Sequence, residues 1–217
     1  MQKKYNPEQT KEKIISISTA LFVEKGYDKT SMQDIVNALG MSKGAIFHHF
    51  KSKEDIFDAA LTNIANEQMA AYKNLLANEM KNLNARDKIT QIIQISMGDS
   101  GDNDNELSKI LTGRANDPKI ILGIMKFNME KSAPLLADLL REGIIDGSIS
   151  TTSPDENAEV LLLLLNLWCE PMIFECDVKR FRKRLEHFQF LMKISGIDVV
   201  SNELIDNIIE MHRKYLR

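Results

Sequence analysis

The chain has few of the residues that interrupt helices, cross-link a fold or anchor it in a bilayer. Only 5 prolines and 10 glycines occur in 217 residues, which leaves room for long helices. The longest apolar run, Val160–Leu165, has six residues, far short of the ~20 that span a bilayer. The cysteines, Cys169 and Cys176, are too few for a disulfide framework. No apolar segment follows residues 1–8, so we expect no signal peptide. These absences predict a mostly helical, cytoplasmic protein with no membrane partner.

The chain does have an ordinary globular composition and an uneven distribution of charge. Apolar residues make up 43% and charged residues 27% of a length that allows one or two domains. The net charge is −3, but residues 1–53 carry nine lysines against five acids, and the remaining residues sum to −7. Residues 43–53 hold three lysines, two histidines and no acid. Such a stretch is typical either of a solvated face or of a surface that binds a polyanion.

Helix start and stop signals divide the N-terminal segment into short elements. Capping residues precede each predicted helix, and a glycine follows the first two. The third helix is too short to be stable alone in water, so it must be held by packing. The signals are, in order, Asn6 and Pro7 with Gly26, Thr30 or Ser31 with Gly40, Ser42 with Phe50, and Ser52 before Lys53.

The second and third of these helices, with the glycine turn between them, have the helix-turn-helix pattern. Ile46 and Phe50, four residues apart, supply one inward face of the third helix. Its remaining side chains are left to point elsewhere. By geometry alone the pattern fits a DNA-reading motif or an ordinary helical corner with a polar outer face.

Three runs give this segment a more specific character: LFVEKGY at residues 21–27, TSMQDI at residues 30–35 and LGMSKGAIFHHFKSKE at residues 39–54. They lie in a stretch, residues 10–57, that resembles the TetR family of bacterial transcriptional regulators over about 48 of 217 residues without gaps. The resemblance implies an all-α fold in two parts. Residues 1–53 are expected to form a three-helix, helix-turn-helix DNA-binding domain, and residues 54–217 a helical effector-binding and dimerisation domain.

Carried over position by position, the resemblance makes Lys43 and Gly44 the direct base readers. The N-terminal residues of a recognition helix reach base edges, lysine can donate to guanine, and glycine permits close approach. Phosphate contacts are expected from the donors that match the family's phosphate-binding positions, with a further contact from the second helix. These residues are Ser42, His48, His49 and Lys53, with Thr30 or Ser31 from the second helix.

Two positions depart from the common family pattern. Phe47 stands where the family often has tyrosine, and Ala45 where it often has threonine or another polar residue. Phe47 lacks a hydroxyl that would bond a phosphate, although both side chains can touch a thymine methyl group. The departures therefore bear on the operator sequence rather than on DNA binding.

Downstream, the sequence predicts further helices. One long helix over residues 53–82 is expected to connect the two domains, and later ones begin near Asn84 and Pro118. Ser153, Pro154 and Glu156 have the spacing of a capping box at the start of another.

Two segments predict a subunit interface. Residues 160–168 are apolar almost all round, so this helix must be covered on more than one side. In residues 178–192, apolar positions recur at the 3–4 spacing of a coiled-coil-like seam. Two such helices from each of two subunits would make a four-helix interface, as the resemblance also implies; the alternative is a purely internal core. The interface residues are Leu161, Leu164, Leu165, Phe181, Leu185, Phe188 and Met192.

A cluster of five basic residues at positions 179–184 flanks that seam. Charges beside an apolar seam favour solubility and partner choice. A second nucleic-acid surface is the alternative.

An effector pocket is expected where Pro171 interrupts a helix and an acid stands among large apolar side chains. Glu170 would favour a cationic or hydrogen-bond-donating ligand, and the chain's 11 methionines suit an adaptable cavity. The alternative is a set of core residues beside a surface acid. Free cysteines are the expectation for Cys169 and Cys176, with redox sensing left open. The pocket residues are Trp168, Cys169, Glu170 and Met172.

A polar connection over residues 98–105 contains two misleading patterns. Gly98-Asp99-Ser100-Gly101 has the letters of a trypsin-like nucleophile motif, but the alternating strands of that fold are missing. Asp102, Asp104 and Glu106 alternate as in a calcium loop that lacks its glycine and distal glutamate. We expect no catalytic residues, no cofactor and no metal.

The sequence therefore predicts a homodimeric, ligand-responsive transcriptional repressor that is not an enzyme. Its expected partners are a palindromic double-stranded DNA operator and a small-molecule effector of unknown identity. The alternatives are a helical enzyme with a vestigial DNA-binding head and a regulator or interaction module that senses a protein partner.

Overall fold

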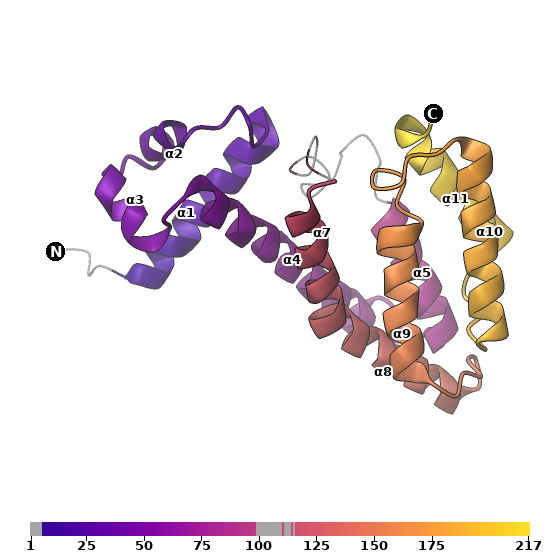
Figure 1. The fold of residues 1–217 in the computed structure, drawn as a ribbon. Coiled ribbons are helices and arrows are strands. Elements are labelled where there is room, and N and C mark those ends of the chain that lie inside the picture. Colours follow the sequence, from indigo (N-terminus) through magenta and orange to yellow (C-terminus); the bar gives the residue numbers. More distant parts are fainter. Residues whose placement is uncertain (1–5, 99–109, 111–113, 115) are drawn as a thin grey trace. The chain divides into compact units, whose positions relative to one another are not determined.

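The computed structural model describes residues 6–98, 110, 114 and 116–217, and all the regular secondary structure within them is helical (Figure 1). The all-α prediction is confirmed. The elements are α1 (Pro7–Lys25), α2 (Met32–Leu39), α3 (Lys43–His49), α4 (Lys53–Asn78), α5 (Ala85–Gly98), α7 (Pro118–Phe127), the π-helical turn η1 (Asn128–Ser132), α8 (Ala133–Asp146), α9 (Pro154–Leu163), the π-helical turn η2 (Leu164–Trp168), α10 (Val178–Ile194), α11 (Asn202–His212) and the 3₁₀ turn η3 (Arg213–Tyr215).

The chain divides into two compact units. Unit 1 contains the described residues up to Ala70 together with Ile110, and unit 2 contains the other described residues from Ala71 onward. The first packing unit therefore extends well into α4, beyond the boundary after residue 53 that the sequence suggested. The division into residues 1–53 and 54–217 remains a proposal about function.

Unit 1 is held together by a small aromatic and aliphatic core. Phe22 of α1 and Phe57 of α4 are fully buried and meet edge to face, with ring centroids 5.5 Å apart. Tyr27, in the turn after α1, packs on Phe57 at 4.6 Å. Ile35 of α2 and Ile46 of α3 are also fully buried. Each short helix thus contributes one apolar face to a common core, which supplies the packing that α2 and α3 need.

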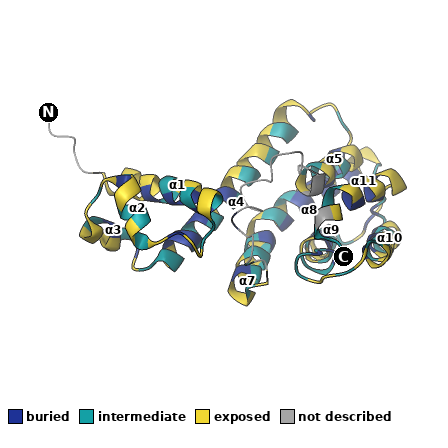
Figure 2. Cartoon of the chain, turned by 90° about the horizontal axis from the view of Figure 1, so that it is seen from above, coloured by how far each residue is buried: buried dark blue, intermediate teal, exposed yellow. Residues whose placement is uncertain are grey.

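Unit 2 has α8 between α5 and α9, while α11 packs against both α5 and α10. Buried residues lie on the inward faces of these helices and exposed residues on the outward faces (Figure 2). Leu140 of α8, Leu161 of α9, Leu185 of α10 and Ile208 of α11 are almost completely buried. These helices share one apolar core.

Most predicted helix starts are correct, with one exception in the side-chain detail. Asn6 accepts hydrogen bonds from the amides of Glu8 and Gln9 at 3.1 and 3.4 Å, as expected for an N-cap. Ser153 stands at the N-cap of α9, but its side chain makes no capping hydrogen bond. The long helix ends at Asn78 rather than at residue 82.

Two further expectations concern the polar connection at residues 98–105 and membrane-spanning helices. The polar connection at residues 98–105, with its protease-like and calcium-like patterns, lies outside the described residues apart from Gly98 at the end of α5. Among the described residues, no helix is both long enough and apolar enough to cross a membrane.

Candidate DNA-binding surface

The turn between α2 and α3 is built from local hydrogen bonds that the sequence specifies. Ser31 and Asp34 form a capping box at the start of α2, and these bonds lower the pKa of Asp34, the Ser31 hydroxyl contributing most. Gly40 ends α2 with φ 62° and ψ 27°, a left-handed conformation that glycine adopts without strain. Ser42 then caps α3 by accepting the amide of Ala45 at 3.2 Å. The turn therefore fixes the angle at which α3 leaves α2.

The surface of α3 divides into an inward and an outward face. Ile46 and the C-cap Phe50 are buried. On the outward side, Phe47 is 39% exposed, and the Lys43 ammonium lies 5.5 Å from the centre of its ring. This face is named here the α3 surface: the exposed Ser42, Lys43, Gly44, Phe47 and His48, with the half-buried Ala45 and His49.

The α3 surface carries donors and open space rather than acids. A methyl group added at Gly44 would meet no atom within 4 Å, so the backbone there is open to a partner's approach. The rings of His48 and His49 meet at right angles, with centroids 5.4 Å apart. A cationic, acid-free helix face beside exposed backbone suits the edge of a nucleic-acid groove.

Two residues predicted to contact DNA have their side-chain donors engaged inside unit 1. Thr30 is buried, and its hydroxyl donates to the carbonyl oxygen of Gly26 at 2.8 Å. The ammonium of Lys53 donates to the carbonyl oxygens of Tyr27 and Thr30, each at 2.8 Å. These two side chains therefore hold the turn between α1 and α2, a role that motif position alone did not reveal.

Ser31 and Ser52 cap the helices that they precede, as the helix start signals predict. Ser31 is exposed, but its hydroxyl donates to Asp34 at 2.5 Å and is occupied by the capping box. At the start of α4, the Asp55 carboxylate accepts the Lys51 amide at 3.0 Å, and the Ser52 hydroxyl accepts the Asp55 amide at 3.1 Å. The α4 N-terminus is thus capped by its own side chains.

One exposed cation beside the α3 surface was missed by the position-by-position comparison. Lys51 lies in the link between α3 and α4 and is exposed. The signal that could have found it was its place in the acid-free stretch at residues 43–53.

Most residues of the predicted subunit interface are buried within a single chain. Phe181, Leu185, Phe188 and Met192 of α10 are all at most 1% exposed within a single chain. Leu161 and Leu165 are buried as well, and Leu164 is half-buried. The 3–4 seam packs inside unit 2. The spacing identifies an apolar stripe, but it does not show which helix covers that stripe.

Other apolar residues of α9 and α10 remain exposed. Phe190 is 55% and Ile194 65% exposed, and both lie outside the seam on α10. His187 joins them to η2, because its ring contacts those of Trp168 and Phe190 with both centroid distances at 6.0 Å. We call this the outer face: Val160, Leu163, Trp168, His187, Phe190 and Ile194.

The four predicted pocket residues lie in different environments. Cys169 is fully buried, and burial raises the pKa of its thiol to about 12. Glu170 and Met172 are half-buried, and the Glu170 carboxylate accepts the Met172 amide at 3.0 Å. Burial raises the pKa of Glu170, while that hydrogen bond and the charge of His212 act in the opposite direction. Trp168 contacts the exposed His187, so it belongs to the outer face as well.

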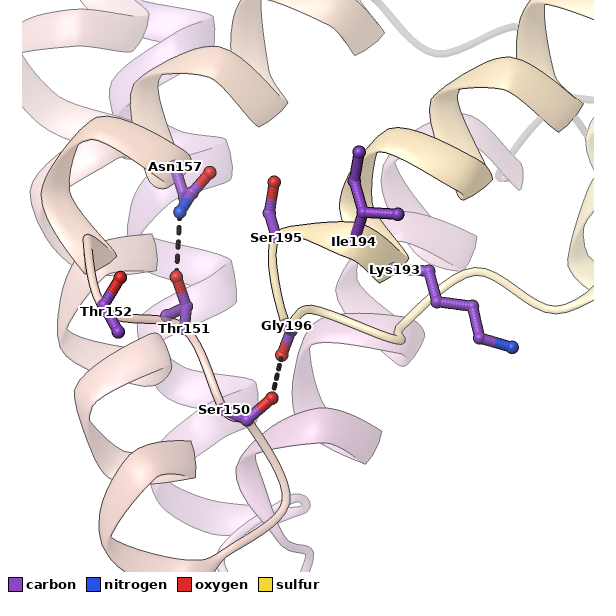
Figure 3. A pocket seen from close by; sticks show the side chains of 8 residues that line it. All are labelled: Ser150, Thr151, Thr152, Asn157, Lys193, Ile194, Ser195 and Gly196. Atoms are coloured by element: carbon purple, nitrogen blue, oxygen red, sulfur yellow. Dashed lines mark hydrogen bonds between the residues drawn. The ribbon is translucent and has the colours of Figure 1, made fainter.

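A separate hollow in unit 2 is lined mainly by polar side chains (Figure 3). It lies where the α8–α9 turn meets the end of α10, with no residue in common with the predicted pocket. Asn157 donates to the Thr151 hydroxyl at 2.8 Å, and the Ser150 amide donates to the Gly196 carbonyl at 2.9 Å. The Lys193 side chain points away from Thr151 (Figure 3). These polar groups serve the junction itself.

No group of three or more His, Cys, Asp or Glu side chains suited to a metal ion occurs among the residues with described positions. Cys169 and Cys176 are both free thiols.

Comparison with known proteins finds a family match that includes α2 and α3. The model of a family described as bacterial regulatory proteins, tetR family, matches residues 14–60. The transcriptional repressor KstR2 of Rhodococcus jostii is 33% identical over 64 residues, which are 30% of this chain and 31% of that protein. Matches to three curated relatives cover less than a third of the length of each.

Solved structures extend the likeness to the whole fold. A TetR-family regulator from Mesorhizobium loti aligns with a TM-score of 0.61 over 98% of this chain and 97% of its own, at 21% identity. RolR, solved in complex with the ligand resorcinol, aligns with the same TM-score over 93% and 94% at 14% identity. At these identities the likeness establishes the fold.

Proposed function

We propose that the chain is a DNA-binding transcriptional repressor of the TetR family of bacterial regulatory proteins. The observation that carries the proposal is the α3 surface. It follows a tight glycine turn, lacks acids and presents Lys43 and an unobstructed Gly44 at its N-terminal end. The family match over residues 14–60 contains this whole motif.

In this proposal the residues of unit 1 have different tasks. Lys43 and the Gly44 backbone meet base edges, with Ala45 and Phe47 close to thymine methyl groups. Ser42, His48 and His49 contact phosphates, and Lys51 adds a cation. Thr30, Ser31 and Lys53 act indirectly, by holding the turns that orient α2 and α3.

We propose that the protein acts as a homodimer through the outer face. A palindromic operator read by two recognition helices requires a two-fold arrangement. The outer face offers exposed apolar and aromatic side chains, Phe190 and Ile194 above all, which suit the centre of an interface. This surface replaces the buried seam as the dimerisation candidate.

We also propose that a small molecule binding in unit 2 controls DNA binding. Support comes from the fold, which is shared with RolR, a protein whose structure contains resorcinol. Glu170 and Met172 keep the position of pocket candidates, with Trp168 at its edge, whereas Cys169 contributes no exposed surface. An effector would act by binding the DNA-competent and DNA-incompetent states with different affinity.

The enzyme alternative has less support. The curated relatives above are named as transcriptional repressors or regulators. A repressor acts on the chromosome, so we propose a cytoplasmic location. Sensing of a protein partner instead of a small molecule is kept as the second candidate, because the exposed outer face would also serve such a contact.

The proposal is tested by selecting bound fragments from genomic DNA and measuring binding to one of them by fluorescence anisotropy over a series of salt concentrations. Affinity should fall steeply as salt rises, because phosphate contacts release counterions. Lys43→Ala should weaken binding and relax the sequence preference, with the fold intact.

Lys179→Ala is the matched control, since it removes an exposed lysine from the basic cluster of α10. It should leave binding unchanged. Equal losses in the two variants would favour a second nucleic-acid surface, and a protein that selects no fragment at low salt would contradict the repressor proposal.

A further inference from the structure

A buried amide in unit 2 lacks a hydrogen-bond partner. Asn128 is 9% exposed, and its side-chain nitrogen Nδ2 is buried with no acceptor within bonding distance among the described residues. Its oxygen Oδ1 accepts a long bond of 3.4 Å from the Ser132 hydroxyl. A buried donor without a partner destabilises the folded state, so its presence in a native protein calls for an explanation.

The position of this amide in the backbone is also unusual. Asn128 is the first residue of η1, the π-helical turn that joins α7 to α8. Such turns widen a helix locally and occur often at functional sites. η1 continues α7 directly into α8 and packs against α9, so a group that reaches Asn128 lies beside α9.

The surroundings define the chemistry of a partner. Ile124 and Met125, four and three residues before Asn128, lie on the same helix face and are half-buried. The charged neighbours Lys126, Glu130 and Lys131 are exposed to solvent. The amide thus stands in an apolar setting whose nearby charges point outward.

We propose that Asn128 is the polar anchor of a binding site for a small, neutral, mainly apolar molecule that carries a hydrogen-bond acceptor, such as a carbonyl oxygen. Nδ2 donates to that oxygen, and the half-buried isoleucine and methionine side chains cover the apolar part. The amide remains unpaired in the empty protein because the ligand supplies its acceptor. A molecule of the same shape without an acceptor leaves Nδ2 unpaired and binds more weakly.

This site differs from the Glu170 region in what it selects. A carboxyl group there would accept a hydrogen bond or balance a cation, whereas Asn128 offers a donor. Ligand binding at Asn128 does not require DNA, because all the residues of this site belong to unit 2.

A matched pair of probes tests the proposal: acetophenone, which has a carbonyl acceptor, and isopropylbenzene, which has nearly the same shape and none. Thermal unfolding of the full chain is followed with each probe at equal concentration. The unsubstituted protein should show a larger rise in Tm with acetophenone, because only this probe pairs with Nδ2.

Asn128→Leu should remove this difference between the probes while unfolding, without probe, at a temperature no lower than the unsubstituted protein. Asn166→Leu is the control: this exposed asparagine donates to the Leu162 carbonyl at 3.0 Å, and its replacement should preserve the acetophenone preference.

The proposal fails if neither probe raises Tm, if both raise it equally, or if Asn128→Leu keeps the preference. A Tm of Asn128→Leu well below that of the unsubstituted protein would mean that the amide is satisfied in the empty protein, which also overturns the proposal. None of these readouts involves DNA, so they separate this inference from the repressor proposal.

Discussion

Lys53 and Tyr27 are joined twice in unit 1. The Lys53 ammonium lies 4.0 Å from the centre of the Tyr27 ring and donates a hydrogen bond of 2.8 Å to the Tyr27 carbonyl oxygen. The Tyr27 hydroxyl in turn donates to the Glu54 carboxylate. The first turn of α4 is therefore fastened to the link between α1 and α2, on which the placement of α2 and α3 depends.

Lys53→Met should lower the stability of unit 1, because the Lys53 ammonium bonds within this unit. The substitution keeps the apolar stem but removes the donor for the carbonyl oxygens of Tyr27 and Thr30, so we expect a loss of about 1–3 kcal/mol in the free energy of unfolding. Urea unfolding measures it.

Lys51→Met is the comparison, because Lys51 is exposed. It should leave stability unchanged, weaken operator binding and reduce the salt slope by about one phosphate contact. If Lys53→Met unfolded like the unsubstituted protein and behaved like Lys51→Met in binding, its assignment to the fold would be wrong.

Gly44→Ala should increase the stability of the protein while it weakens DNA binding. The added methyl group meets no atom within 4 Å, and alanine favours a helix over glycine, so the variant should gain about 0.5–1 kcal/mol. If the α3 backbone approaches the bases closely, the same methyl group should weaken operator binding about tenfold, or roughly 1.4 kcal/mol.

Gly40→Ala provides the contrast, because its φ of 62° is unfavourable for alanine and should make this variant less stable. Thermal unfolding and anisotropy titration follow both variants. Undiminished binding by Gly44→Ala would remove close backbone approach from the proposed DNA interface.

Local sequence patterns are sufficient to predict helix caps. Asn6 and Ser42 cap the helices that they precede, because a cap depends on a few neighbouring backbone groups. The direction in which Phe181 or Lys53 points depends on residues far along the chain, and no spacing rule contains that information. The burial of Asn128 could not be predicted from the sequence, since a single asparagine forms no pattern with its neighbours.

Phe190→Glu should dissociate the proposed dimer without unfolding the chain. Phe190 is 55% exposed on the outer face, so a charge there remains hydrated in the monomer but would be buried and unpaired in an interface. Sedimentation velocity measures the change, and operator affinity should fall with it.

Ile145→Glu is the matched control, because Ile145 is 86% exposed on α8, a helix that contributes no residue to the outer face. It should leave the association state unchanged. Phe188→Ala should instead destabilise the chain by about 3–5 kcal/mol, since it empties a buried core position. Dissociation by Ile145→Glu but not by Phe190→Glu would place the interface elsewhere.

Glu170→Gln should stabilise the protein at neutral pH and have a diminishing effect as the pH falls. Burial raises the pKa of Glu170 above its ordinary value of 4.5, so folding favours the protonated carboxyl group. At pH 7 the carboxylate of the unfolded chain is ionised and fully hydrated. In the folded protein, burial makes the ionised form less favourable, so the free energy of unfolding is reduced. Below about 4.5 both states are protonated and the penalty disappears.

The glutamine is neutral throughout and can still accept the Met172 amide, so the difference between the two proteins should be largest above the raised pKa and close to zero in acid. Urea unfolding between pH 4 and 8 tests the sign. His212 opposes the effect, because its charge lowers the pKa of Glu170, and His212→Asn should therefore increase the stabilising effect of Glu170→Gln. A stabilising effect that grew towards low pH would show that Glu170 is held as a carboxylate, and would favour a cation as its partner.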